Sequence, residues 1–162
     1  MKKNNRQDQP RHDAKNGIFF IRQSNNSNNC RLNTINAFFG YEKYTSKNFA
    51  TMACAFDTIY KTSGSKNFTS FVEKSDGTGL TSIVSYIIEM DNRFRCITCL
   101  PNEELFDDDD FVAICLFNNE HMWLEKLVET QWYRIDSRSR KPVKIKKPSR
   151  QMTLGRIYIL NK

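Results

Sequence analysis

One cysteine and one histidine in this chain stand where thiol chemistry could take place. Cys30 lies between an asparagine-rich loop and an apolar segment, in the run NSNNCRLNTINAFFG, whereas the other four cysteines have apolar neighbours. Of the two histidines, His12 lies in a polar N-terminal stretch, which leaves His121 as the candidate base. A cysteine nucleophile needs such a base, and the base needs an acceptor on its other ring nitrogen. Asp136, fifteen residues after His121, is the candidate acceptor.

A helix is expected to present the thiol. Apolar residues recur at helical spacing from residue 30 to residue 39, with Asn28 or Asn29 available as the N-cap and Gly40 as the terminator. Cys30 is therefore predicted in the first turn of a helix. There the helix dipole and a nearby imidazolium can bring a thiol pKa to roughly 3.5–7.5.

A β-hairpin is expected to bring the base and its acceptor together. Two β-rich runs flank Glu129 and Thr130, which can form a two-residue turn. His121 would then face Arg138, and Asp136 would be its diagonal neighbour on the same face, about 7–8 Å away between backbones. A three-residue loop would place His121 and Asp136 on opposite faces unless a bulge intervened.

The remaining pattern predicts helices first and an antiparallel sheet second, which is typical of an α+β domain. Two further apolar stripes at helical spacing predict helices, and short β-rich runs predict strands. The expected helices cover residues 30–39, 46–60 and 78–90, and the expected strands cover residues 17–22, 93–100, 111–117, 121–128, 132–137 and 156–160.

The composition indicates one folded domain. The chain has 162 residues, of which 39% are hydrophobic, enough for a sizeable core. Residues 1–16 are polar and basic, so we expect a disordered leader before a single domain over residues 17–162. The sequence predicts neither a membrane span nor a signal peptide. We therefore expect a monomeric intracellular protein of the cytoplasm or nucleus, with reduced cysteines.

The net charge of +7 leaves two interpretations open. Basic residues concentrate between Arg138 and Arg150, a composition that suits nucleic acid or an acidic surface. A solvated basic loop is the commoner case, and no nucleic-acid-binding motif accompanies the charge, so we rank nucleic-acid binding last. The acidic run from Asp107 to Asp110 is likewise expected to be a solvated connection between strands.

The CITC run offers the one metal-like spacing in the sequence. Possible zinc ligands are Cys96, Cys99, Cys54, Cys115 and His121. However, the CxxC pair lies inside a strand-like apolar run that has no second CxxC and no turn glycine. We expect buried structural thiols there, with no metal and no cofactor.

Several segments in order resemble the Josephin family, the papain-like cysteine-protease domain of ataxin-type deubiquitinases. Cys30 opens the expected helix and Asn36 follows six residues later, as in the family pattern. YTSKNFATMACAFD and GTGLTSIVSYIIE are similar to the two helices that follow in the family, and FNNEHMWLEKLVETQWYRIDS is similar to its late segment with His121 and Asp136. The resemblance covers roughly residues 18 to 145.

This resemblance implies a papain-like fold, with N-terminal helices packed on a C-terminal antiparallel sheet. It also implies a thiol-dependent deubiquitinase in which Cys30, His121 and Asp136 cleave after the C-terminal Gly of ubiquitin or a ubiquitin-like modifier. The alternative is a weak or inactive ubiquitin-binding module. The family's oxyanion-hole Gln lies five residues before the cysteine, where this chain has Asn25, so the donor is expected to be Asn25 or Gln23.

Overall fold

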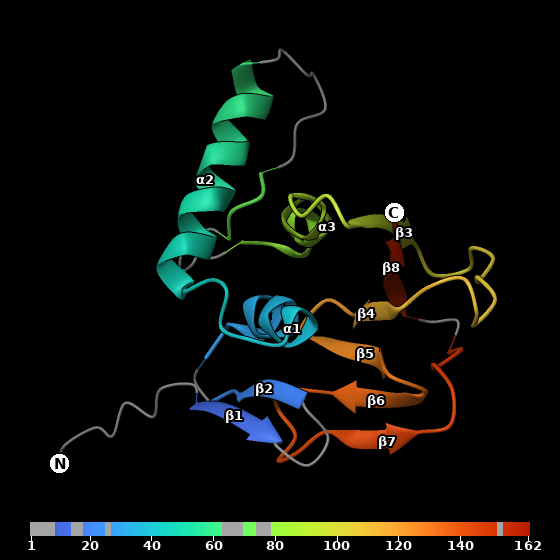
Figure 1. Ribbon diagram of the computed structural model, residues 1–162. Coiled ribbons are helices and arrows are strands. Elements are labelled where there is room, and N and C mark those ends of the chain that lie inside the picture. The colour runs from blue at the N-terminus through green and yellow to red at the C-terminus, as the bar shows by residue number, and fades with distance from the viewer. Residues whose placement is uncertain (1–8, 14–17, 25–26, 63–69, 74–78, 152–153) are drawn as a thin grey trace, which may run out of the picture.

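The computed structural model (Figure 1) describes residues 9–13, 18–24, 27–62, 70–73, 79–151 and 154–162. This part of the chain is a mixed α/β domain with three α-helices and a six-stranded antiparallel sheet. The helices are α1 (Cys30–Phe39), α2 (Ser46–Thr62) and α3 (Val84–Glu89), the last preceded by the 3₁₀ turn η1 (Thr81–Ile83). The strands are β1 (Gln9–Asp13), β2 (Ile18–Arg22), β3 (Phe94–Cys99), β4 (Ala113–Phe117), β5 (Met122–Val128), β6 (Gln131–Ile135), β7 (Val143–Ile145) and β8 (Gly155–Asn161).

The main sheet has the strand order β3-β8-β4-β5-β6-β7, and each neighbouring pair is antiparallel. β1 and β2 form a separate antiparallel pair. Helix α1 packs against β2 and β5, while α2 extends away from the sheet (Figure 1). The main core lies between α1, α3 and the central strands, where Ile35, Ile87 and Leu124 have no exposed surface.

Helix α1 has the bounds that the sequence predicts, because Gly40 adopts a φ of +83° that ends the helix in the left-handed region. Asn36 then fixes the chain that leaves the helix. Its buried amide accepts from the backbone N–H groups of Lys43 and Tyr44 and donates to the Tyr44 carbonyl. Asn36 therefore has a structural role in the connection from α1 to α2.

The helical arm differs from expectation in two ways. The third predicted helix, residues 78–90, is shorter, because Gly79 bridges to Val72 and only α3 continues from η1. By its spacing, Ile59 belongs to the apolar stripe of the expected helix 46–60, yet it is 61% exposed because this part of α2 projects beyond the sheet. Tyr60 instead contacts Phe71 and Tyr86 through edge-to-face ring pairs.

Two strands lie where the sequence predicts none. Residues 9–13, within the stretch expected to be a disordered leader, form β1, because backbone pairing with β2 requires no apolar side chains. Residues 1–8 and 14–17 lie outside the described part. β7 falls in the basic segment and pairs with β6. Among the described helices, none has the length and apolarity needed to cross a bilayer.

Candidate functional site

The start of α1 places Cys30 against the sheet. Asn29 is the N-cap, so Cys30 is the first helical residue, and its backbone N–H has no acceptor within the helix. The residue is 1% exposed. Thr34, one turn later, donates its hydroxyl to the Cys30 carbonyl (2.7 Å) and to the carbonyl of Met122 on β5 (3.4 Å). This shared donor ties the first turn of α1 to the strand that follows His121.

The β5–β6 hairpin has the register that the two-residue turn predicts. Val128 pairs with Gln131, and the first turn residue, Glu129, has a φ of +57°. At the other end of the hairpin, His121 Nε2 lies 2.7 Å from Asp136 Oδ1. The even loop therefore brings these two side chains to the same face, as expected for the diagonal pair.

Neighbouring groups hold the imidazole and the carboxylate in place. The His121 backbone N–H donates to Asn118 Oδ1 (2.8 Å), and the Arg138 backbone N–H donates to Asp136 Oδ1 (2.9 Å). The Trp123 ring stacks on the imidazole, with 6.0 Å between ring centroids and an interplanar angle of 23°. The pair is thus constrained through both backbone and ring contacts.

The electrostatics favour a thiolate and an imidazolium. Burial raises the pKa of Cys30, but His121, the charge of Arg31 and the backbone of Met122 together outweigh burial, so the pKa is lowered overall. Burial lowers the pKa of His121, but the interactions with Asp136 and Cys30 raise it more, and together these effects raise the pKa of His121 to about 9. At neutral pH the imidazole is therefore protonated, which stabilises the negative charge on the sulfur.

The second ring nitrogen is available to the thiol. Nδ1 of His121 is buried and has no aligned hydrogen bond within the described residues. His121 nevertheless lowers the pKa of the Cys30 thiol, and Cys30 raises the pKa of His121. Among the groups that lower the pKa of Cys30, His121 has the largest effect.

Gln23 contacts the residue that follows Asp136, whereas Asn25 lies outside the described residues. The Gln23 backbone N–H donates to the Ser137 carbonyl (2.7 Å), and the Gln23 side-chain carbonyl accepts from the Ser137 hydroxyl (2.7 Å). Its side-chain N–H₂ donates to the Ser27 carbonyl (2.6 Å). In this structure the amide therefore braces the loop before α1 against the residue that follows Asp136.

Arg31 and Thr34 were not among the sequence candidates. The Arg31 guanidinium is held by the Thr81 hydroxyl (2.8 Å), and its charge helps to lower the pKa of Cys30. Their sequence positions, one and four residues after the cysteine, are compatible with these roles. The contacts depend on η1 and β5, however, so helical spacing alone could not identify them.

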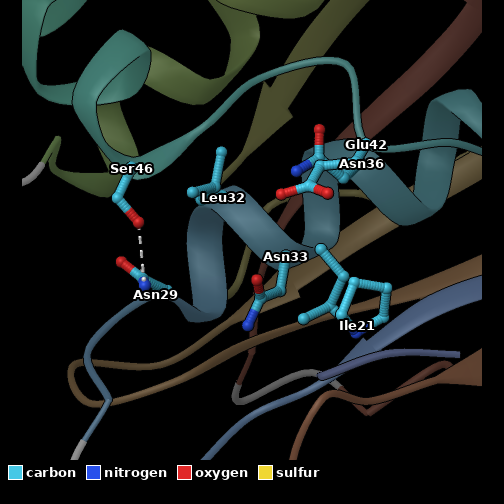
Figure 2. Close-up of a pocket in the computed structure, with 8 residues that line it drawn as sticks. Ile21, Asn29, Leu32, Asn33, Asn36, Glu42 and Ser46 are labelled. Carbon is cyan, nitrogen blue, oxygen red and sulfur yellow. Dashed lines mark hydrogen bonds between the residues drawn. The ribbon is translucent and has the colours of Figure 1, made fainter. Parts of the chain in front are cut away.

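A pocket on another side of α1 contains none of the three candidate catalytic residues. Figure 2 shows this pocket, with Asn29 donating to the Ser46 hydroxyl across it (3.1 Å). Its lining residues are Pro10, Ile21, Asn29, Leu32, Asn33, Asn36, Glu42 and Ser46. One of these lining residues, Asn36, holds the chain between α1 and α2 through its hydrogen bonds to Lys43 and Tyr44. Asn36 therefore has a structural role at this pocket.

The acidic loop and the CITC run belong to other elements than Cys30: CITC lies in β3, and the acidic loop connects β3 to β4. The acidic loop precedes β4, whereas His121 follows it, and Arg150 forms an ion pair with Asp108 of that loop (3.4 Å). Within the described residues, no group of three or more His, Cys, Asp or Glu side chains could hold a metal. Burial raises the pKa of Cys96 to about 12.

The chain matches no protein-family model, and no curated protein is significantly similar to it in sequence. The Josephin resemblance therefore stays a prediction from short segments.

Proposed function

We propose that this protein is a cysteine peptidase of papain-like, Josephin-type architecture that hydrolyses the bond after the C-terminal Gly of ubiquitin or a ubiquitin-like modifier. The observation that carries the proposal is the convergence of Cys30, His121 and Asp136. The thiol lies at a helix start, and the imidazole binds the carboxylate at 2.7 Å. The choice of substrate comes from the sequence resemblance.

In the proposed mechanism, the Cys30 thiolate attacks the carbonyl carbon of the terminal glycine. The carbon–nitrogen bond breaks as His121 gives its proton to the leaving lysine amine, which leaves a thioester. His121 then takes a proton from water, the resulting hydroxide attacks the thioester, and the carbon–sulfur bond breaks to restore the thiolate. Asp136 orients the imidazole and supports its positive charge throughout.

The burial of the thiol supports a slender substrate. Cys30 is 1% exposed and His121 is 7% exposed. Two glycines bring no side chains, so a Gly-Gly terminus needs less room to reach the sulfur than other sequences do. The developing oxyanion would be stabilised by the Cys30 backbone N–H together with an amide of Gln23 or Asn25. Gln23 would first have to exchange its Ser27 acceptor for the substrate.

A ubiquitin probe with a C-terminal electrophile tests the proposal. We expect the wild-type protein to form a covalent adduct, Cys30→Ser to form none, and Cys54→Ser to react like wild type, because Cys54 is an exposed thiol on α2. Intact-protein mass spectrometry measures the adduct. Labelling that persists in Cys30→Ser would rule out the assigned nucleophile.

The second candidate is a ubiquitin-binding module without useful activity. It is favoured by the Gln23 amide, which is committed to Ser27 and so does not serve an oxyanion in this structure. This candidate predicts that ubiquitin binds wild type and Cys30→Ser equally, while the probe forms no adduct and a ubiquitin–fluorophore substrate is not cleaved. Adduct formation at Cys30 excludes it.

A further inference from the structure

A second pocket, which we call the Lys126 pocket, lies at the end of α1 that is farther from Cys30. Its volume of about 290 Å³ is near the lower limit of ligand pockets, roughly 300–1,000 Å³. Phe38 and Phe39, the last two residues of α1, line it together with Lys126 of β5. Phe38 is about 12 Å along the helix from Cys30. Lys126 is about 17 Å along the extended chain from His121. The pocket is therefore separate from the candidate active site.

Phenylalanine rings form an apolar wall of the Lys126 pocket. Phe94, at the start of β3, packs edge-to-face against Phe38 (4.9 Å between ring centroids) and Phe39 (6.3 Å). The Phe38 and Phe39 rings also contact each other, at 5.0 Å. Phe38 is buried, whereas Phe39 and Phe94 are only partly buried. The three rings hold one another in place and offer contact surface to a compact apolar group.

Lys126 adds a cation to this apolar surrounding. Its Nζ donates to the Phe38 carbonyl (2.8 Å), and its remaining N–H donors have no acceptor among the described residues. In the same part of the chain, no carboxylate forms an ion pair with Lys126. Burial lowers the pKa of Lys126, and no neighbouring carboxylate opposes that effect. The charged form therefore lacks the partner that a partly buried cation usually has.

The other cation that lines the pocket, Arg93, already has a partner. Its guanidinium binds Asp91 (2.7 Å), and this contact lowers the pKa of Asp91 to about 2. Lys43 Nζ also lies 3.9 Å from Asp91. A ligand in the pocket therefore meets one cation that lacks a carboxylate. One such cation suits a singly charged carboxylate better than a phosphate group, which carries close to two charges.

We propose that the Lys126 pocket binds a small amphipathic anion, a carboxylate joined to a compact apolar group such as an aromatic ring. The carboxylate accepts from the Lys126 ammonium, and the apolar group lies against the three phenylalanine rings. Partial burial strengthens such an ion pair relative to one in open solvent. The inference does not depend on the proposed function, because none of the three candidate catalytic residues lines this pocket.

The probe for this site is 2-naphthoate, a carboxylate on two fused rings. The reference compounds are 2-naphthamide, which has the rings without the charge, and acetate, which has the charge without the rings. In isothermal titration calorimetry, we expect the wild-type protein to bind one 2-naphthoate per chain. We expect both reference compounds to bind roughly tenfold or more weakly, since each lacks one of the two interactions.

Two variants with matched controls locate the bound probe. Lys126→Met keeps an apolar stem but removes the cation, so it should weaken 2-naphthoate binding roughly tenfold or more. Lys47→Met, at an exposed position of α2, should change it by less than about twofold. Asn161→Trp adds a large ring at an exposed position that lines the pocket and should block binding, whereas Thr98→Trp, at an exposed position of β3, should not. Circular dichroism checks that every variant is folded.

Three results would overturn the inference: equal affinities for 2-naphthoate and 2-naphthamide, undiminished 2-naphthoate binding in a folded Lys126→Met or Asn161→Trp protein, or no measurable binding to the wild type at millimolar concentrations. The Asn161→Trp measurement decides the matter if Lys126→Met does not fold. Electrophile labelling of Cys30 tests the proposed function alone, so either proposal can fail while the other stands.

Discussion

The two ends of α1 both contact the β5 region, but through different kinds of ionisable group. At the first residue, Cys30 interacts with His121, which is paired with Asp136 at 2.7 Å. At the other end, Lys126 Nζ donates to the Phe38 carbonyl (2.8 Å), and burial lowers its pKa. A cation with a carboxylate partner keeps its proton at neutral pH and can assist chemistry. A cation held by a carbonyl serves to dock the helix.

The largest difference between the two ends should be in turnover. We expect His121→Ala to lower the hydrolysis of a ubiquitin–fluorophore substrate by roughly 10³-fold or more, as the loss of a triad member does in other enzymes. Lys126→Ala should lower it by less than about tenfold, since Lys126 acts only through the position of α1. Initial rates at pH 7 measure both. Equal losses in the two folded variants would contradict the separation of roles.

A smaller difference should appear in stability. Lys126→Met keeps the apolar stem but removes the donor from the Phe38 carbonyl, so we expect a loss of about 1–2 kcal/mol in the free energy of unfolding. Lys47→Met, at an exposed position on α2, should change it by less than about 0.5 kcal/mol. Urea titration followed by circular dichroism measures both. A Lys126→Met protein as stable as wild type would show that the contact does not hold the helix.

An effect of similar size is expected in the pH dependence of stability. Asp136 raises the pKa of His121, so the stabilisation by this pair is complete below about pH 6.5 and is lost as the pH rises through the raised pKa. The lowered pKa of Lys126 has the opposite sign: its buried charge costs free energy until the pH rises through that pKa towards 10.5. The two ends of α1 should therefore respond to pH in opposite directions.

The Cys30→Ser background isolates the histidine contribution, because thiolate formation otherwise offsets the proton that His121 retains. In that background we expect the free energy of unfolding to fall by about 1–2 kcal/mol between pH 6.5 and pH 9. The double variant with His121→Gln should lack this fall. Urea midpoints at several pH values measure it, and parallel curves for the two proteins would refute the His121–Asp136 contribution.

The hairpin shows why part of the site could be predicted. The alternation of the two strands and the two-residue turn fix which residues share a face, so the relation of His121 to Asp136 follows from counting positions. Helix α1 was predictable for a similar reason, since its apolar spacing and Gly40 are local signals. By contrast, β1 and β7 form through backbone pairing with β2 and β6. The side chains of such short, mostly polar runs carry no pattern from which this pairing could be predicted.

By itself, the sequence determined the bounds of α1 and the short list of side chains able to act as nucleophile, base and acceptor, and it reduced the hairpin register to two alternatives, of which the structure has the two-residue turn. These properties depend on periodicity and on neighbours along the chain. Only the tertiary structure decided that the start of α1 lies against β5 and that Arg31 adds its charge to the thiol's surroundings. It also decided that the Gln23 amide braces Ser27. These contacts join residues distant in sequence, and the packing of the common core fixes them.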